Sequence, residues 1–133
     1  MRFTTFFIAV LAYQAAIGQS LEQFLSHPIS SELAQSQDGV LLAWVVNDHG
    51  RRNIFVHANG ATRQLTSYKE DDGQELSGLL FSEKGDLHVY VRGGATNRRG
   101  ENPNPASQPE GAEQAIWCVN VSPGSEPFRL ASG

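Results

Sequence analysis

The chain has 133 residues and a formal net charge of −4, with 40% hydrophobic and 18% charged residues. This length predicts one modest domain, and the acidic balance excludes the basic surface expected of a nucleic-acid-binding protein. The 13 glycines favour short strands and many turns over long helices. The single cysteine, Cys118, excludes a disulfide within the chain, and its apolar neighbours in the sequence predict a buried side chain.

Residues 1–18 have the three-part layout of a secretory signal peptide. Arg2 is followed by an apolar run at 3–17, and small residues stand three and one positions before the expected cleavage between Gly18 and Gln19. The run is shorter than the ~20 residues that span a membrane as a helix, and an uncleaved anchor is the alternative. The sequence therefore predicts an exported protein, periplasmic or extracellular, with no membrane association after cleavage.

Residues 19–30 predict a short helical lead-in. Ser20 and Gln23 have the spacing of a capping box, in which the side chain of each residue bonds the backbone amide of the other. Pro28 ends the helix, because a proline pushes the residue before it towards extended backbone geometry. We expect this lead-in to precede the first strand rather than to form a domain.

From residue 31 onward, apolar strands alternate with turns that contain glycine, asparagine or aspartate. Residues 31–68 form one unit of four short strands, and residues 69–133 form a second unit with a long polar loop at 93–111. A turn is predicted at 48–53. The predicted strands are 31–36, 40–47, 54–58, 62–67, 75–82, 86–93, 115–121 and 128–132.

The two units share a motif. The stretch SQDGVLLAWV, residues 36–45, aligns with SEKGDLHVYV, residues 82–91, at its serine, glycine, leucine, aromatic and final valine positions. A four-stranded unit of about 40–50 residues in tandem is typical of the blades of a β-propeller. We therefore expect an all-β fold of two four-stranded antiparallel blades.

The second predicted strand is apolar on both faces, with Ala43 and Val45 on one and Leu42 and Trp44 on the other. Such a strand needs packing above and below it, which neighbouring blades supply. Trp44 and Trp117, both in the middle of strands, are predicted to be core. Two blades do not close a ring of 4–8, so we expect an incomplete propeller, a fragment whose open blade faces favour self-association.

A longer likeness runs through the second unit. The segments QLTSYKEDDGQELSGLLFSEKGDLHVYVRGG, NRRGENPNPAS and AIWCVNV resemble the N-terminal propeller of secreted bacterial serine peptidases of the prolyl oligopeptidase family, the relatives of dipeptidyl and acylaminoacyl peptidases. The resemblance covers residues 21–133. Its most specific part is YKEDDGQEL running into VYVRGG.

The resemblance implies a propeller that caps a C-terminal α/β-hydrolase domain and limits entry to short peptides. It also implies a nucleophile in a Gly-x-Ser-x-Gly elbow with Asp and His later in the chain. None of the twelve serines stands in that motif, so no catalytic residue is assigned and the chain alone is expected to be inert. No cofactor or metal site is assigned either. Peptide substrates would be partners only through the hydrolase domain.

Glu70, Asp71 and Asp72 are candidates for a substrate-access role, because they belong to the densest acidic cluster of the sequence. Their carboxylates would face the central cavity and meet the amino terminus of a peptide. A solvated turn between blades is the alternative. A calcium loop does not fit, because placing Gly73 sixth in the loop leaves tyrosine first and leucine twelfth.

Arg98 and Arg99 lie in the long loop at 93–111 and are further candidates for contact with substrate. Loops of this length are often functional, and we expect this one to protrude from a propeller face and shape access to the cavity. A variable surface insertion, with the two arginines solvated, is the alternative.

Two other function classes stand beside the peptidase. A non-enzymatic periplasmic propeller, similar to the Tol-system propeller protein, would use the same signal peptide and strands to bind a partner. A truncated reading frame would have no function of its own. The stretch YKEDDGQEL favours the peptidase interpretation.

Overall fold

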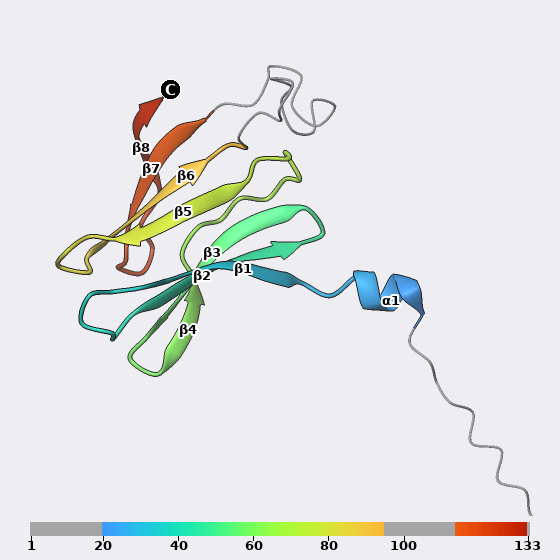
Figure 1. The fold of residues 1–133 in the computed structure, drawn as a ribbon, viewed down its shortest axis with the longest axis horizontal. Coiled ribbons are helices and arrows are strands. Elements are labelled where there is room, and N and C mark those ends of the chain that lie inside the picture. Colours follow the sequence, from blue (N-terminus) through green and yellow to red (C-terminus); the bar gives the residue numbers. More distant parts are fainter. Residues whose placement is uncertain (1–19, 95–113, 133) are drawn as a thin grey trace, which may run out of the picture.

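The structure is a computed structural model that describes residues 20–94 and 114–132 (Figure 1). The predicted signal peptide, its cleavage between Gly18 and Gln19, and most of the predicted loop with Arg98 and Arg99 lie outside these residues. Among the helices of the described ranges, none is long and apolar enough to cross a membrane.

Two four-stranded antiparallel sheets make up almost all of the described chain, which confirms the prediction of a mainly β fold. Each sheet is a meander in which sequence neighbours are also spatial neighbours, β1-β2-β3-β4 in sheet 1 and β5-β6-β7-β8 in sheet 2. The elements are α1 (Leu21–Leu25), β1 (Ile29–Gln35), β2 (Leu42–Asp48), β3 (Arg51–Ala58), β4 (Ala61–Gln64), β5 (Leu76–Phe81), β6 (Leu87–Arg92), β7 (Ala115–Asn120) and β8 (Phe128–Ser132).

The short helix α1 begins with the predicted capping box. Ser20 Oγ accepts a hydrogen bond from the Gln23 amide at 3.1 Å, and Gln23 Oε1 accepts one from the Ser20 amide at 3.1 Å. The helix ends at Leu25, and β1 begins at Ile29, which already pairs with Asn47. Strand β1 therefore begins two residues before the predicted strand at 31–36.

The turn predicted at 48–53 is wrong in its second half, because β3 begins at Arg51. The turn consists of His49 and Gly50, whose φ angles are 53° and 85°. A two-residue turn of this kind matches the twist of the flanking strands and keeps Asp48 opposite Arg51. Arg51 Nη2 lies 2.6 Å from Asp48 Oδ2, and this ion pair supports the pairing of β2 with β3. In the sequence, the two adjacent arginines suggest a solvated turn instead of a strand.

The repeated Ser-x-x-Gly motif forms the same turn in both sheets. Ser36 Oγ accepts from the Leu41 amide at 2.9 Å, and Ser82 Oγ accepts from the Leu87 amide at 3.1 Å. In each motif the glycine amide donates to the serine carbonyl at 2.9 Å. The two glycines have φ angles of 74° and 72°, the left-handed region that favours glycine. The sequence repeat is therefore also a repeat of structure.

A bulge recurs at matching places in β1 and β5. At its centre stand Glu32 and Gly78, 46 residues apart, with φ angles of 55° and 61°. The Gly78 amide donates a hydrogen bond to Glu32 Oε2 at 3.1 Å. The side chain at the first bulge therefore bonds the backbone at the second and joins the first strands of the two sheets.

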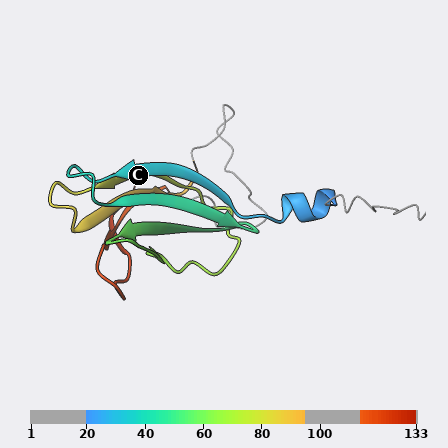
Figure 2. The ribbon, with the colours of Figure 1, turned by 90° about the horizontal axis from the view of Figure 1, so that it is seen from below.

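The two sheets stack on each other (Figures 1 and 2). Each sheet has a front face and a back face, which we define at equivalent positions of the two repeats. The front face of sheet 1 packs on the back face of sheet 2. The back face of sheet 1 and the front face of sheet 2 therefore point away from the shared core. The core between them contains Ala43, Val45, Ile54 and Val56 from the front face of sheet 1, and Leu76, Leu79, Tyr90 and Val119 from sheet 2.

The back face of sheet 1 is only half-buried. Trp44 lies on this face and stacks on Phe55, with ring centroids 6.4 Å apart and an angle of 20° between the rings. The prediction that Trp44 is core is therefore wrong in the described part of the chain, where no sheet covers this face. Trp117 does pack against the core, as predicted.

Candidate functional site

Residues 65–75 connect β4 of sheet 1 to β5 of sheet 2 and carry the acidic cluster. Asn53 holds this linker, because its Nδ2 donates to the Tyr68 carbonyl at 2.9 Å and its Oδ1 accepts from the Tyr68 amide at 2.7 Å. Thr66 Oγ1 donates to Asn53 Oδ1 at 3.0 Å and accepts from the Ile54 amide at 2.9 Å. Asn53 and Thr66 are both buried, so these bonds fix the path of the linker.

Tyr68 carries the linker across to sheet 2. Its hydroxyl oxygen lies 2.7 Å from that of Tyr90, and the guanidinium carbon of Arg92 lies 4.7 Å from the centroid of its ring. Arg92 also forms an ion pair with Asp72. We call these four residues the seam, because they join the linker to the back face of sheet 2.

The two tyrosines of the seam are neutral. Burial raises the pKa of Tyr90, and its hydrogen bond with Tyr68 raises that pKa further. Burial also raises the pKa of Tyr68. Both hydroxyls therefore remain protonated at neutral pH and act as hydrogen-bonding groups, not as bases. This chemistry suits a contact that holds two sheets together better than it suits proton transfer.

The structure separates the three acidic candidates. Asp72 belongs to the seam and also accepts a hydrogen bond from the Gln74 amide at 2.9 Å through Oδ1. Asp71 lies against the turn of sheet 1, where its carboxylate occupies the space that a Cβ added to Gly50 would need. Glu70 is exposed. Asp72 therefore has a structural partner, while Glu70 and Asp71 present carboxylates at the surface.

A second ion pair joins sheet 1 to the end of the linker beside the seam. Arg52 Nη2 lies 3.0 Å from Glu75 Oε1, and Arg52 Nη1 donates to the Gly50 carbonyl at 3.0 Å. These groups lie where β2 and β6 end and where β3 and β5 begin. We call this region the charged end of the two sheets. It also holds Asp48, His49, Arg51, Lys69, Glu70 and Asp71.

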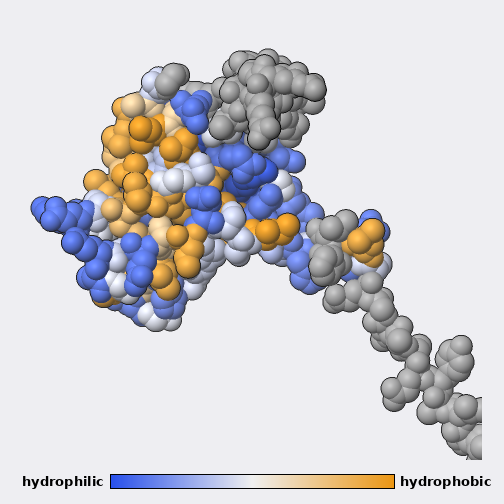
Figure 3. All heavy atoms as spheres, viewed as in Figure 1, coloured by the Kyte–Doolittle hydropathy of each residue, from blue (hydrophilic) through white to orange (hydrophobic). Residues whose placement is uncertain are grey.

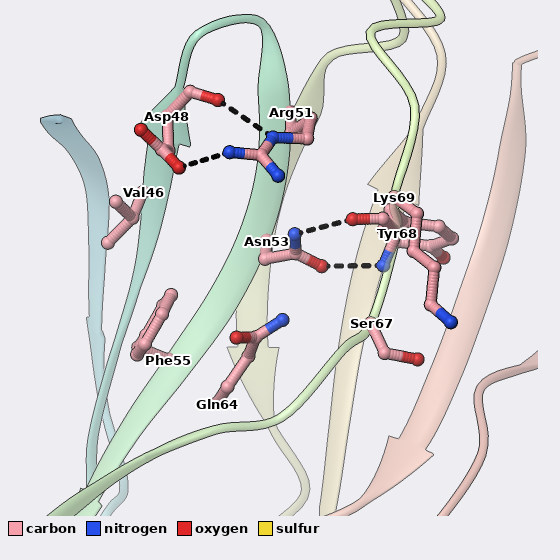
Figure 4. A pocket seen from close by; sticks show the side chains of 9 residues that line it. All are labelled: Val46, Asp48, Arg51, Asn53, Phe55, Gln64, Ser67, Tyr68 and Lys69. Carbon is pink, nitrogen blue, oxygen red and sulfur yellow. Dashed lines mark hydrogen bonds and ion pairs between the residues drawn. The ribbon is translucent and has the colours of Figure 1, made fainter. Parts of the chain in front are cut away.

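A pocket of about 250 Å³ opens beside the linker at the charged end (Figure 4). Val46 and Phe55, from the back face of sheet 1, line one side of it. The ion pair between Asp48 and Arg51 lies at one end, and Lys69 of the linker lies opposite Val46 and Phe55. The pocket therefore combines an apolar side with charges of both signs.

The pocket offers one cation for an incoming anion. The hydrogen bond between His49 Nδ1 and Asp48 Oδ1, 2.7 Å long, lowers the pKa of Asp48, and Arg51 lowers it further. Asp48 is therefore ionised at neutral pH, and its charge offsets that of Arg51. Lys69 then suits a carboxylate, and Ser67 adds a hydroxyl to the lining. Such a lining suits a small anionic group such as a carboxylate.

Other reactive side chains of the described ranges are buried or scattered. No group of three or more His, Cys, Asp or Glu side chains there could hold a metal ion. Cys118 is buried, as predicted, and burial raises the pKa of its thiol, which disfavours the nucleophilic thiolate. His88 is fully buried, and burial lowers its pKa to about 4, so it is neutral at pH 7.

Sequence reasoning found Asp72 but missed Asn53 and the other three residues of the seam, Tyr68, Tyr90 and Arg92. One signal was available, because the alignment of the two units places Arg92 where the first unit has Val46, and His88 where it has Leu42. A polar residue at a position that is apolar in the other repeat indicates a special partner. The identity of that partner depends on the path of the linker and is not readable from spacing.

A comparison with models of known protein families finds no match for this chain, and no curated protein matches it.

Proposed function

We propose that sheets 1 and 2 are the first two blades of a β-propeller that admits and orients short peptides for a serine peptidase domain outside these 133 residues. The proposal includes export through the N-terminal segment, with cleavage between Gly18 and Gln19. The reaction class comes from the resemblance of YKEDDGQEL and its surroundings to the prolyl oligopeptidase family.

The observation that carries the proposal is the repetition of the sheets. Both are four-stranded meanders with the same turn and the same bulge, and the front face of one packs on the back face of the next. Propeller blades are sheets of this kind arranged around a central channel. The hydrogen bond between Glu32 and Gly78 joins the first strands of both sheets, which suits strands that line such a channel.

The charged end supplies groups that suit peptides. A short peptide carries an ammonium group at one end and a carboxylate at the other. Glu70 and Asp71 are exposed carboxylates of the linker, and Lys69 borders the pocket. Charge-assisted hydrogen bonds to both ends orient a small zwitterion, and such bonds are roughly twice as strong as neutral ones.

The encoding gene, read past the codon for Gly133, gives the first test of this function. We expect further Ser-x-x-Gly units, then a Gly-x-Ser-x-Gly elbow whose serine is labelled by a fluorophosphonate probe in the purified product. The secreted product should begin at Gln19. A product with no labelled serine would overturn the peptidase, and a ring that closes without a hydrolase domain would favour a partner-binding propeller instead.

The role of the linker has its own test in the same product. Glu70→Gln combined with Asp71→Asn should raise KM for peptides with a free amino terminus and leave KM unchanged for the same peptides after acetylation. The matched control is Glu83→Gln, which removes an exposed carboxylate from the turn before β6, away from the charged end. An equal effect on free and acetylated peptides would exclude recognition of the amino terminus.

A further inference from the structure

The front face of sheet 2 is apolar, and no sheet covers it within the described residues. Val89 pairs with Cys118 and Val91 pairs with Ile116, so these four side chains share this face, and Phe128 of β8 extends it. Cys118 is buried, and Val89 and Val91 are half-buried. Ile116 and Phe128 are 42% and 43% exposed. Figure 3 shows apolar surface gathered over β5–β8. A contiguous apolar patch of this kind marks an interaction surface.

The equivalent positions of sheet 1 are fully covered. Ala43 pairs with Val56 and Val45 pairs with Ile54, in the same arrangement as their counterparts in sheet 2. All four are at most 2% exposed, because the back face of sheet 2, with Tyr90 in the same core cluster, lies on them. The molecule therefore contains one complete example of the contact that the front face of sheet 2 lacks.

The chain also carries the other half of that contact. On the back face of sheet 1, Trp44 pairs with Phe55, just as Tyr90 pairs with Trp117 on the back face of sheet 2. In both sheets an aromatic pair occupies the two middle strands. Tyr90 is buried against sheet 1, whereas Trp44 and Phe55 remain half-exposed. An aliphatic front face and an aromatic back face are thus both left open, at opposite sides of one molecule.

We propose that a second copy of this chain covers the front face of sheet 2 with the back face of its own sheet 1. The contact is head to tail, so each copy uses both faces once and repeats the packing already present between its own sheets. Each copy contributes two blades, and propellers have 4–8 blades. Two, three or four copies of the two described blades therefore supply the blades of a closed ring.

This inference rests on the propeller part of the proposed function, but not on the peptidase. A third blade in the same chain would occupy the same face, and the experiment below therefore uses these 133 residues by themselves. The two proposals fail separately, because association of the 133-residue chain requires no hydrolase domain and peptide cleavage requires no association.

Light scattering of the full 133-residue chain tests the ring. We expect one species with two, three or four times the chain mass of 14.5 kDa. Ile116→Glu on the front face and Trp44→Glu on the back face should each give single copies, because an unpaired charge is not buried without a large cost. Val40→Glu changes an exposed turn residue and should keep the wild-type mass.

Mixing the two single-copy variants separates head-to-tail contact from other modes. The Ile116→Glu chain keeps its back face and the Trp44→Glu chain keeps its front face, so an equal mixture should form pairs of twice the chain mass and stop there. A wild-type chain of single-copy mass, a mixture without pairs, or glutamate variants that keep the wild-type mass would overturn the proposal. Circular dichroism checks that each variant retains its sheets, and Phe55→Glu replaces Trp44→Glu if that variant unfolds.

Discussion

Sheets 1 and 2 carry similar residues at matching positions, but they bury opposite faces. Ile54 on the front of sheet 1 is fully buried, whereas its counterpart Ile116 in sheet 2 is 42% exposed. At the bulge, Leu79 of sheet 2 is 7% exposed, whereas its counterpart Leu33 of sheet 1 is 75% exposed. The local sequences are alike, so the difference in exposure comes from whether another sheet packs on that face. An apolar residue stabilises the fold only where such packing removes it from water.

The two sheets differ chemically where they meet. Tyr90 stands where sheet 1 has Trp44, and Arg92 stands where it has Val46. These more polar residues are accommodated because the linker brings Tyr68 to them, which bonds the hydroxyl of Tyr90 and stacks under Arg92. The covered back face is therefore the more polar of the two, and its polar groups serve to position the linker.

The largest expected contrast comes from the paired leucines at the bulges. Leu79→Ala leaves a cavity in the core and should lower the free energy of unfolding by about 2–5 kcal/mol. Leu33→Ala removes an exposed side chain and should change it by no more than about 0.5 kcal/mol. Urea unfolding measures the free energy of unfolding of both variants, and an unchanged m-value shows that the change lies in stability. Similar losses for the two variants would show that the sheets are not buried as described.

Acid should act on sheet 2 through His88, which packs edge-on against Phe81 with ring centroids 4.7 Å apart. Its pKa is about 4 in the fold and about 6.5 in the unfolded chain. Between pH 6.5 and pH 4, His88 binds a proton in the unfolded chain but not in the folded chain. The contribution of neutral His88 to the free energy of unfolding is therefore complete above pH 6.5 and is lost as the pH falls towards 4. The loss should reach about 3 kcal/mol.

The matching residue of sheet 1 supplies the control for this pH dependence. Leu42 occupies the position of His88, so His88→Leu should keep the fold and remove the loss between pH 6.5 and 4. The lowered pKa values of Asp38, Asp48 and Asp86 place their titration below this window. Urea midpoints at pH 7 and pH 4.5 measure the difference. A variant as acid-sensitive as the wild type would assign the effect to other groups.

A smaller effect is expected from the seam, which sheet 1 lacks. Tyr68→Phe leaves the buried Tyr90 hydroxyl without its partner and should cost about 1–3 kcal/mol. Adding Tyr90→Phe should restore part of the loss, because both polar groups are then gone. A double-mutant cycle on unfolding free energies measures this coupling. Additive losses would mean that the hydroxyl contact contributes nothing to stability.

The smallest contrast concerns the glycines of the two turns. Gly39→Ala and Gly85→Ala should each cost about 1–2 kcal/mol, because both positions are left-handed. Gly85→Ala should cost a few tenths more, because its new Cβ would lie 3.3 Å from Leu41 Cδ1 of the other sheet, while Gly39 meets only the flexible end of Gln35. Thermal unfolding of both variants measures the difference, and a larger loss for Gly39→Ala would contradict it.

Much of the fold was predictable because it is local. The Ser-x-x-Gly turns and the apolar alternation of the strands follow from nearest neighbours in the sequence, and the structure contains all eight predicted strands. The boundaries at Ile29 and Arg51 were less predictable, since a cross-strand ion pair extends β3 into a pair of arginines. The positive φ of Glu32 could not be predicted from the sequence, because glutamate rarely adopts such a φ angle. Its counterpart at the second bulge, Gly78, is a residue that does so readily.

The candidate site was predictable only in part. The acidic cluster drew attention to Asp72, but its ion pair with Arg92 depends on how the linker crosses between the sheets. Asn53 carries no sequence signal for its role, because its two bonds to Tyr68 join residues 15 positions apart through a turn and a strand. Local patterns report which residues are polar, whereas their partners are set by long-range packing.

The meander order of the strands has a consequence for how the molecule is made. Every ladder joins strands that are adjacent in the sequence. All except β6–β7, whose strands end at Arg92 and begin at Ala115, close short loops at low entropic cost. Sheet 1 is complete at Gln64, before any residue of β5 is needed. The local pairing therefore allows sheet 1 to form before sheet 2, and its front face then offers the surface on which sheet 2 packs.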